Sequence, residues 1–334
     1  MNTKLRPIPL IDVEDVMPED YSATKCAPHL EFSNGSCIPL EILIKMGEAY
    51  NKYCESKQVN SEPILLDSRL DTLYPDDYKK YLLSEFGKRF DGDQKDWINS
   101  KFLELMDEDA KDHLENKVFR PDGPQGRFDW LSTIDINQVL YQYEEKYPGF
   151  KFLGAVPMDF MELDYLPFKT LKFEDLEKEG INKIGVIFNT DKSHQRGKHW
   201  ISLFCDFDNA QIYFSDSMGT RPPNEVSEFM GMLEKYIANK RKNKSAKYNK
   251  ASEKISENGT KLDKYNKSYD VDVRYNKTQH QKGNSECGVY SINFILRLLK
   301  GKTFDHITRK RLTDNQVNKC RIKYFGKMDE SKFD

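Results

Sequence analysis

A cysteine at the start of an apolar helical pattern is the residue whose setting most clearly suggests chemistry. Cys287 lies in the segment Gln281-Lys-Gly-Asn-Ser-Glu-Cys287-Gly-Val-Tyr, which leads into apolar residues at helical spacing. The free N–H groups and the dipole of a helix N-terminus favour an anion, and can lower a cysteine pKa from ~8.5 to roughly 3.5–7.5. The segment therefore predicts a nucleophilic thiolate, although an ordinary core cysteine that begins a helix would give the same pattern. Gly288, without a side chain, would let a substrate backbone come close.

A nucleophilic cysteine needs a base within hydrogen-bonding reach, and this base can be distant in sequence. His199, in Gly197-Lys-His-Trp, stands at the start of a strand pattern, a rigid position from which an imidazole can point into a cleft. His194, in a polar loop, and His280, beside the cysteine segment, remain alternatives. We expect His199 to be the base.

The base in turn needs a carboxylate that holds its far nitrogen and fixes the tautomer. Asp216 ends the strand pattern that follows that of His199, so a hairpin would bring the two side chains to the same end. Asp206 and Asp208 are alternatives, but they lie near the turn at the opposite end of the hairpin. Asp216 is therefore the predicted third member of the triad.

Attack on a carbonyl creates an oxyanion that preorganised hydrogen-bond donors must stabilise. The backbone N–H of Cys287 supplies one donor. The carboxamide of Gln281, six residues upstream, is the predicted second donor, and Gln279 is an alternative that only geometry can exclude.

The elements that position these residues follow from hydrophobic periodicity. The first ~125 residues carry helical apolar stripes. Two prolines and two glycines within Phe119-Arg-Pro-Asp-Gly-Pro-Gln-Gly126 mark a break. We therefore predict a mainly helical N-terminal domain over residues 1–125 and a catalytic domain over residues 126–334. The helices expected in the first domain span residues 38–55, 76–90 and 93–114.

Past the break, strand and helix patterns alternate, which predicts an α+β fold with a central mixed sheet flanked by helices. A short Asp208-Asn209 turn joins two of the strands into a hairpin. The predicted strands cover residues 183–189, 199–207, 211–216 and 271–275; the predicted helices cover 135–147, a stretch opened by Pro222-Pro223, and 288–300.

A Lys- and Asn-rich insertion over residues 239–270 interrupts the second domain. It contains ten basic and four acidic residues and few large apolar ones. This composition predicts an exposed helical insertion, with a basic docking surface for a substrate or nucleic acid as the alternative.

The overall composition excludes several classes of protein. The 334 residues include 52 basic and 54 acidic side chains, a net charge of −2 that argues against a general nucleic-acid or membrane-surface binder. No apolar run approaches the ~20 residues of a membrane span. The first residues lack a signal-peptide pattern. We therefore expect a protein kept in a reducing compartment rather than secreted, with most of its six cysteines as free thiols.

Four residues near the N-terminus are of types that zinc accepts as ligands: Cys26, His29, Cys37 and, later, Cys54. Their spacing fits no common zinc module, and no phosphate-binding glycine loop is present. The sequence therefore predicts neither a metal nor another cofactor.

The Gly-Lys-His-Trp strand start, an Asp after the next strand, and Gln-x5-Cys-Gly resemble the adenain and ubiquitin-like-protein protease group of cysteine peptidases. The chain order His, Asp, Cys is also that of the group. Within it, the polyprotein-processing proteases of large DNA viruses, such as African swine fever virus and giant viruses, are the most similar. Weaker matches extend from about residue 26 to 325: Cys26-Ala-Pro-His-Leu, Ser36-Cys-Ile, Arg120-Pro-Asp-Gly-Pro, Pro157-Met-Asp-Phe, Asn189-Thr-Asp and Arg311-Leu-Thr-Asp.

The resemblance implies roles for two tryptophans. In that group, a tryptophan after the catalytic histidine and one in a Trp-Leu-Asn-Asp segment wall a narrow channel that admits glycines before the cut bond. Trp200 and Trp130 are the matching positions, and flat aromatic walls would exclude branched side chains. Trp130 is followed by Leu-Ser-Thr, so the second motif is incomplete; both residues could also be ordinary core tryptophans.

The resemblance further implies a thiol endopeptidase that cleaves viral structural precursor proteins after small residues, in Gly-Gly-X or Ala-Gly-X sequences, during virion maturation. Its partner would be a protein substrate, and its place the host cytoplasm (the viral factory) and the virion. An isopeptidase that removes ubiquitin-like or SUMO-like modifiers is the alternative. A binding module that has lost catalysis is a third class, but it would not need His199, Asp216, Gln281 and Cys287 together. The sequence does not specify an oligomeric state.

Overall fold

The computed structural model describes residues 25–57, 62–255 and 270–326, and these form two compact units. The helical unit comprises residues 25–126 together with 321–326, and the sheet unit comprises residues 127–320. Arg321 and Phe325, both buried, thus pack in the helical unit although the predicted boundary assigns them to the catalytic domain. That the chain folds as two separate domains stays a prediction.

The helical unit is built on α1 (Leu40–Lys57) and α3 (Pro75–Arg89), close to the predicted spans. The single helix predicted over residues 93–114 is wrong. Polar side chains divide that stretch, because Asp93 caps a first short 3₁₀ helix and Asp107 accepts from the N–H of Ala110 to start a new helix. The other elements are α2 (Ser68–Leu73), η3 (Gln94–Asn99), η4 (Lys101–Leu105), α4 (Glu108–Lys117) and α11 (Arg321–Tyr324).

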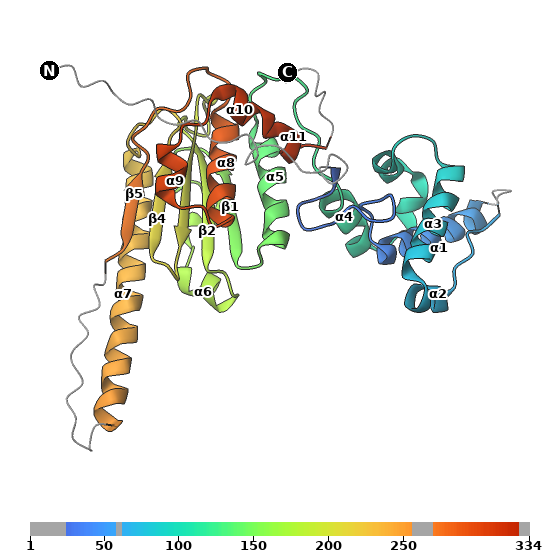
Figure 1. The fold of residues 1–334 in the computed structure, drawn as a ribbon, viewed down its shortest axis with the longest axis horizontal. Coiled ribbons are helices and arrows are strands. Elements are labelled where there is room, and N and C mark those ends of the chain that lie inside the picture. Colours follow the sequence, from blue (N-terminus) through green and yellow to red (C-terminus); the bar gives the residue numbers. More distant parts are fainter. Residues whose placement is uncertain (1–24, 58–61, 256–269, 327–334) are drawn as a thin grey trace. The chain divides into compact units, whose positions relative to one another are not determined.

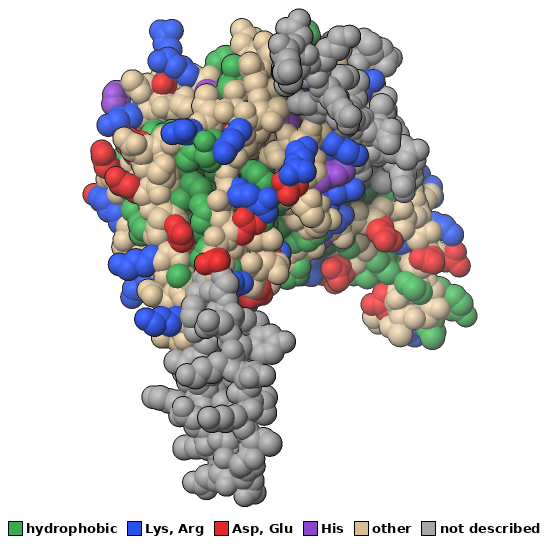
Figure 2. Space-filling model, turned by 60° about the vertical axis from the view of Figure 1, so that its left-hand side comes forward, with side chains coloured by type: hydrophobic (Ala, Val, Ile, Leu, Met, Phe, Trp, Pro, Cys, Tyr) green, Lys and Arg blue, Asp and Glu red, His purple; other side chains and the backbone are tan. Residues whose placement is uncertain are grey.

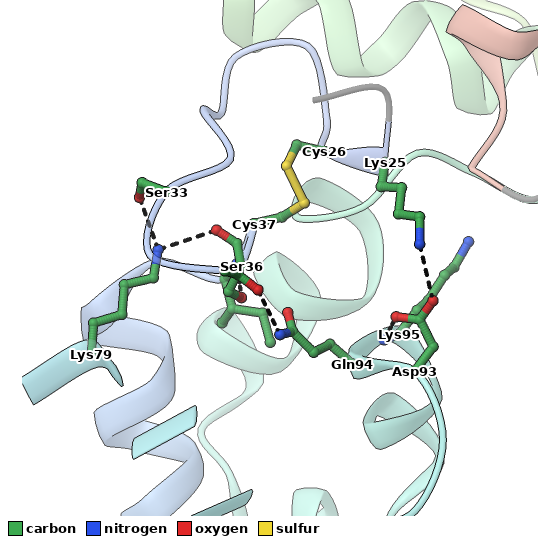
Figure 3. Close-up of a disulfide and its surroundings, with 11 residues drawn as sticks. Lys25, Cys26, Ser33, Ser36, Cys37, Lys79, Asp93, Gln94 and Lys95 are labelled. Atoms are coloured by element: carbon green, nitrogen blue, oxygen red, sulfur yellow. Dashed lines mark hydrogen bonds and ion pairs between the residues drawn. A yellow bond between two sulfur atoms is a disulfide. The ribbon is translucent and has the colours of Figure 1, made fainter. Parts of the chain in front are cut away.

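A disulfide between Cys26 and Cys37 closes a loop at the start of the helical unit (Figure 3). Both cysteines are buried, and the ammonium of Lys79 donates to Ser33 Oγ at 3.1 Å and to the carbonyl of Ser36 at 3.2 Å. The two sulfurs considered as zinc ligands are therefore bonded to each other. Among the described residues, no group of three or more His, Cys, Asp or Glu side chains could hold a metal ion. The remaining four cysteines are free thiols, as expected for most of them.

The sheet unit contains a five-stranded mixed sheet in the order β1-β2-β3-β4-β5, which confirms the predicted α+β fold (Figure 1). β2, β3 and β4 are antiparallel, while β1 and β5 each lie parallel to their neighbour. β1 was not predicted. The strands are β1 (Phe150–Val156), β2 (Lys183–Asn189), β3 (Trp200–Asp206), β4 (Gln211–Ser215) and β5 (Asp272–Tyr275).

Two long helices cover opposite faces of this sheet (Figure 1). Alternate strand residues such as Val186 and Leu203 form one core with Phe229 of α7 (Asn224–Ile255). Gly185 points the other way, and a Cβ built there would lie 3.2 Å from Ile295 of α8 (Cys287–Leu299). Because successive strand residues face opposite sides, the sheet is buried on both. The smaller helices are α5 (Thr133–Lys146), η5 (Pro167–Lys169), α6 (Phe173–Lys178), α9 (Phe304–Arg309) and α10 (Asp314–Lys319).

Helix α7 continues into the predicted insertion, so residues 239–255 are helical, and residues 256–269 lie outside the described part of the chain. On the face shown in Figure 2, Lys and Arg side chains are interspersed with Asp and Glu, as the near-zero net charge suggests. Within the described ranges, no helix is long and apolar enough to cross a bilayer.

Candidate active site

Cys287 is the first residue of α8, the position predicted for a nucleophile. The preceding residue, Glu286, makes no side-chain cap to the helix, so the first N–H groups of α8 are not taken by a capping side chain. Ten further residues of α8 are buried, which fixes the helix against the sheet. The Cys287 thiol is free and held on a rigid element, with only 2% of the residue exposed.

The β3–β4 hairpin brings His199 and Asp216 together at one of its ends. β3 begins directly after His199 and β4 ends directly before Asp216, and the two strands pair antiparallel. The imidazole Nε2 lies 2.6 Å from Asp216 Oδ1. The Cys287 side chain lies close enough to the same imidazole to raise its pKa, and since Nε2 faces Asp216, Nδ1 is the nitrogen left for the thiol. The structure therefore brings the three predicted side chains together.

Burial and these two partners act on the pKa of His199 in opposite directions. Burial alone would lower the pKa of the imidazole, but the hydrogen bonds to Asp216 and to Cys287 outweigh it and raise the pKa to about 9. The ring is therefore protonated at neutral pH.

The Asp216 carboxylate is held by more partners than sequence analysis identified. Its Oδ1 accepts from the N–H of Met218 at 2.8 Å, and the hydroxyl of Thr220 donates to its Oδ2. The side chain of Asn276 donates to the backbone carbonyl of Asp216 at 2.9 Å. Although burial raises the pKa of Asp216, the hydrogen bonds from His199 and Thr220 lower it overall. The carboxylate thus stays charged and fixed beside the imidazole.

The alternative bases and acids lie elsewhere in the sheet unit. His194 is exposed in its loop. His280 is buried beside Tyr290, and its pKa falls to about 4 because burial disfavours the charged ring. Asp206 accepts from the N–H groups of residues 208 and 209 in the hairpin turn, and Asp208 accepts from Asn182. None of these contacts involves Cys287.

Gln281 and Gln279 differ in what surrounds their carboxamides. Gln281 is 2% exposed; its Oε1 accepts from Ser217 Oγ at 2.6 Å and its Nε2 donates to the carbonyl of Gly283 at 3.0 Å. Gln279 is exposed, and its Nε2 donates to the backbone carbonyl of Gln281 at 2.9 Å. Gln281 is thus the preorganised carboxamide of the two, and its role as an oxyanion donor stays a prediction.

Gly288 lies at a closely packed point of the sheet unit. A Cβ at this position would lie 3.1 Å from Leu131 Cβ and 3.3 Å from Trp200 Cδ1. Packing alone thus favours glycine here, and the approach of a substrate backbone to Gly288 stays a prediction. The indole N–H of Trp200 donates to the carbonyl of Leu131 at 2.9 Å, which joins the two residues that a Cβ at Gly288 would crowd.

Adding a methyl group at Gly288 should therefore destabilise the protein although the residue is helical. We expect Gly288→Ala to lower the free energy of unfolding by about 1 kcal/mol, because the crowding of Leu131 Cβ and Trp200 exceeds the gain in helix propensity. Gly231→Ala in α7 is the matched control, since a Cβ there has no neighbour within 4 Å and should stabilise by up to ~1 kcal/mol. Chemical denaturation of both variants measures the difference; equal effects would contradict this account.

A cleft of about 610 Å³ has Trp200, the residue after His199, in its wall, while His199, Asp216 and Cys287 themselves do not line it. Trp130, nearly half exposed, lies on its wall together with Trp200, so the two tryptophans singled out by sequence do line one cavity. The rest of the wall includes apolar residues and a basic loop: Val156, Tyr165, Leu166, Lys192 and Arg196. The cleft is larger than a channel for glycine backbone alone.

Similarity to known proteins identifies the family to which this chain belongs. The family described as the Ulp1 protease family, C-terminal catalytic domain, matches residues 180–333. A protein of Acanthamoeba polyphaga mimivirus that is named as a thiol protease is 34% identical over 305 residues, which cover 90% of this chain and 92% of the relative. The chain therefore belongs to the Ulp1 protease family and is a cysteine peptidase.

More distant relatives come from a second large DNA virus. A SUMO-1 cysteine protease of African swine fever virus is 26% identical over 221 residues, covering 62% of this chain and 71% of the relative. The crystal structure of an African swine fever virus protease aligns with a TM-score of 0.56 at 19% identity, covering 95% of this chain and 99% of that one. The two proteins share this fold, helical N-terminal region included.

Proposed function

We propose that this peptidase is a thiol endopeptidase that cleaves viral structural precursor proteins after small residues, in Gly-Gly-X or Ala-Gly-X sequences, during virion maturation. The observation that carries the proposal is the placement of Cys287, at the start of α8, beside an imidazole that Asp216 holds at 2.6 Å. The relatives described above are proteases of large DNA viruses. We accordingly place its work in the host cytoplasm, at the viral factory, and in the virion.

In the proposed reaction, the Cys287 thiolate attacks the carbonyl carbon of the scissile bond and forms a tetrahedral oxyanion. The backbone N–H of Cys287 and the carboxamide of Gln281 stabilise that charge. The His199 imidazolium then donates its proton to the leaving amine, the C–N bond breaks, and a thioester remains on Cys287. Water, deprotonated by the now neutral imidazole, hydrolyses the thioester and restores the pair.

The cleft lined by Trp130 and Trp200 supports a preference for small residues before the cut bond. An extended substrate whose glycines pass beside Trp200 would meet an indole ring that is fixed by its bond to Leu131, so a branched side chain there would clash. The remaining volume, beside Tyr165 and Leu166, leaves room for side chains further from the cut. The substrate is thus expected to need glycine at the cut and to tolerate larger residues upstream.

The alternative is an isopeptidase that removes a ubiquitin-like modifier. The specific observation in its favour is that a relative from African swine fever virus carries the name SUMO-1 cysteine protease. The triad chemistry would be the same, so only the substrate distinguishes the two functions.

A substrate panel separates these functions. We expect the protein to cleave short Gly-Gly-X and Ala-Gly-X peptides, with little or no cleavage of matched Gly-Val-X peptides, because the fixed indole excludes a branched side chain. Initial rates by chromatography, with Cys287→Ala as the blank, provide the measurement. Efficient cleavage of folded ubiquitin-like fusions, with none of the short peptides, would instead establish the isopeptidase and overturn the proposed endopeptidase.

A further inference from the structure

Ser217 is a buried residue of the sheet unit that directly follows Asp216 and contacts the predicted oxyanion donor. Its hydroxyl donates to Gln281 Oε1 at 2.6 Å, and only 5% of the residue is exposed. Its backbone carbonyl accepts the N–H groups of His280 at 2.8 Å and of Gln281 at 3.0 Å. The turn after β4 is therefore bonded to the segment that precedes Cys287.

These contacts determine which way the Gln281 carboxamide points. A carbonyl oxygen can only accept, so the Gln281 group facing the carbonyl of Gly283 at 3.0 Å must be the Nε2 amide. The oxygen, Oε1, then faces Ser217, whose hydroxyl must be the donor. With Oε1 occupied in this way, the second N–H of Nε2 is the part of the side chain that remains to donate to a substrate.

We propose that Ser217 is a positioning residue for the peptidase reaction: its hydroxyl holds the Gln281 carboxamide with Nε2 directed to the oxyanion. The proposal rests on the proposed function, in which Gln281 stabilises that charge. Two adjacent residues of one short turn would then have separate roles. Asp216 orients the imidazole, and Ser217 orients the oxyanion donor.

The loss of the hydroxyl has a defined consequence. Gln281 Oε1 would become a buried acceptor without its donor, which destabilises the present position of the side chain. Rotating the carboxamide by half a turn would bring Oε1 against the carbonyl of Gly283, where two acceptors repel. We therefore expect the side chain to leave its position and the oxyanion to lose a donor.

The test compares two reactions of the same cysteine. In Ser217→Ala we expect kcat for a Gly-Gly-X peptide to fall by about 10- to 100-fold with KM little changed, since one oxyanion donor is worth ~10²–10³ in kcat. The rate of alkylation of Cys287 by iodoacetamide should stay at the wild-type value, because the thiolate displaces iodide without forming an oxyanion. A variant that was merely misfolded would lose peptide cleavage and would also expose the buried thiols Cys54, Cys205 and Cys320 to alkylation, which the folded protein protects.

A double-mutant cycle then tests whether Ser217 acts through Gln281. The variant carrying both Ser217→Ala and Gln281→Ala should be no slower than Gln281→Ala alone. Ser217→Thr, which keeps the hydroxyl, should recover most of kcat. Ser202→Ala is the matched control: this buried serine of β3 donates to the carbonyl of Ser215 and makes no bond to Gln281, so its kcat should equal that of wild type.

Additive effects in the cycle, or an unchanged kcat in Ser217→Ala, would overturn the positioning role. Failure of the proposed function is a separate outcome, since it would show as a wild-type protein that leaves the peptide uncut or a Cys287→Ala variant that still cuts it.

Discussion

Replacing Cys287 with alanine will abolish peptide cleavage and leave the fold intact. No nucleophile remains, and neither the Cys287 N–H nor Gln281 can replace it, so kcat should fall by at least ~10⁴-fold. Alanine is a good helix former and fills the first position of α8 with only one atom's change in buried volume. The free energy of unfolding should therefore change by less than about 1 kcal/mol. Turnover of a Gly-Gly-X peptide and thermal unfolding of the same sample provide the two measurements.

The control is another free and buried cysteine. Cys54 lies in α1 of the helical unit, and Cys54→Ala should keep full turnover. Iodoacetamide should block wild type and Cys54→Ala equally. Turnover that survives in Cys287→Ala would remove this residue as the nucleophile.

The sequence places the three predicted catalytic residues near one another because each stands at the boundary of a strongly periodic element; their catalytic role stays a prediction. Buried strands β2 to β4 and helix α8 have continuous or helical apolar patterns, and the polar residue that ends such a pattern must emerge at an edge of the fold. His199 and Asp216 flank strands β3 and β4 in this way, and Cys287 begins α8. Their contact depends on tertiary structure, but the β3–β4 hairpin by itself places His199 and Asp216 at the same end.

The parts that sequence analysis missed depend on irregular backbone. β1 contains Gly154 at φ +107° and a shift of register between Phe152 and Ala155, so its residues do not alternate as those of a regular strand do. The helix predicted over residues 93–114 fails because local capping by Asp93 and Asp107 outcompetes the apolar stripe.

The spacing of residues in the sequence also did not predict the residues that support the site. Ser217, Thr220 and Asn276 act through a turn whose close passage requires Gly219, since a Cβ there would lie 2.9 Å from the backbone of residues 278 and 279. Small polar residues are common in the turns of all proteins, so no sequence pattern distinguishes the three residues that support this site.

Asp216→Asn should slow peptide cleavage by about 10²- to 10⁴-fold and also move its pH dependence. In wild type, the imidazolium of His199 must keep its proton to protonate the leaving amine, so kcat/KM should decline at alkaline pH with an apparent pKa near 9. Asparagine removes the carboxylate that raises this pKa, whereas the burial that lowers it remains. The alkaline decline should therefore begin at lower pH in the variant.

The same pair predicts how stability depends on pH. The pKa of His199 is raised above its ordinary 6.5, so its stabilising contribution is complete below that value and is lost as the pH rises through about 9. The pKa of Asp216 is lowered from 3.8, so its contribution is present above that value and is lost in acid. The gap in unfolding temperature between wild type and Asp216→Asn should thus be widest between about pH 4 and 6.5 and narrow on either side.

Asp206→Asn separates an effect on the imidazole from the general cost of losing a buried acid. Asp206 is as buried as Asp216, but it accepts from backbone N–H groups in the hairpin turn and from Asn209. Its replacement should lower stability while the alkaline pKa of kcat/KM stays near 9. If the alkaline pKa of kcat/KM fell equally in both variants, the two carboxylates would act through the stability of the hairpin. A fall confined to Asp216→Asn would identify Asp216 as the carboxylate that holds the base.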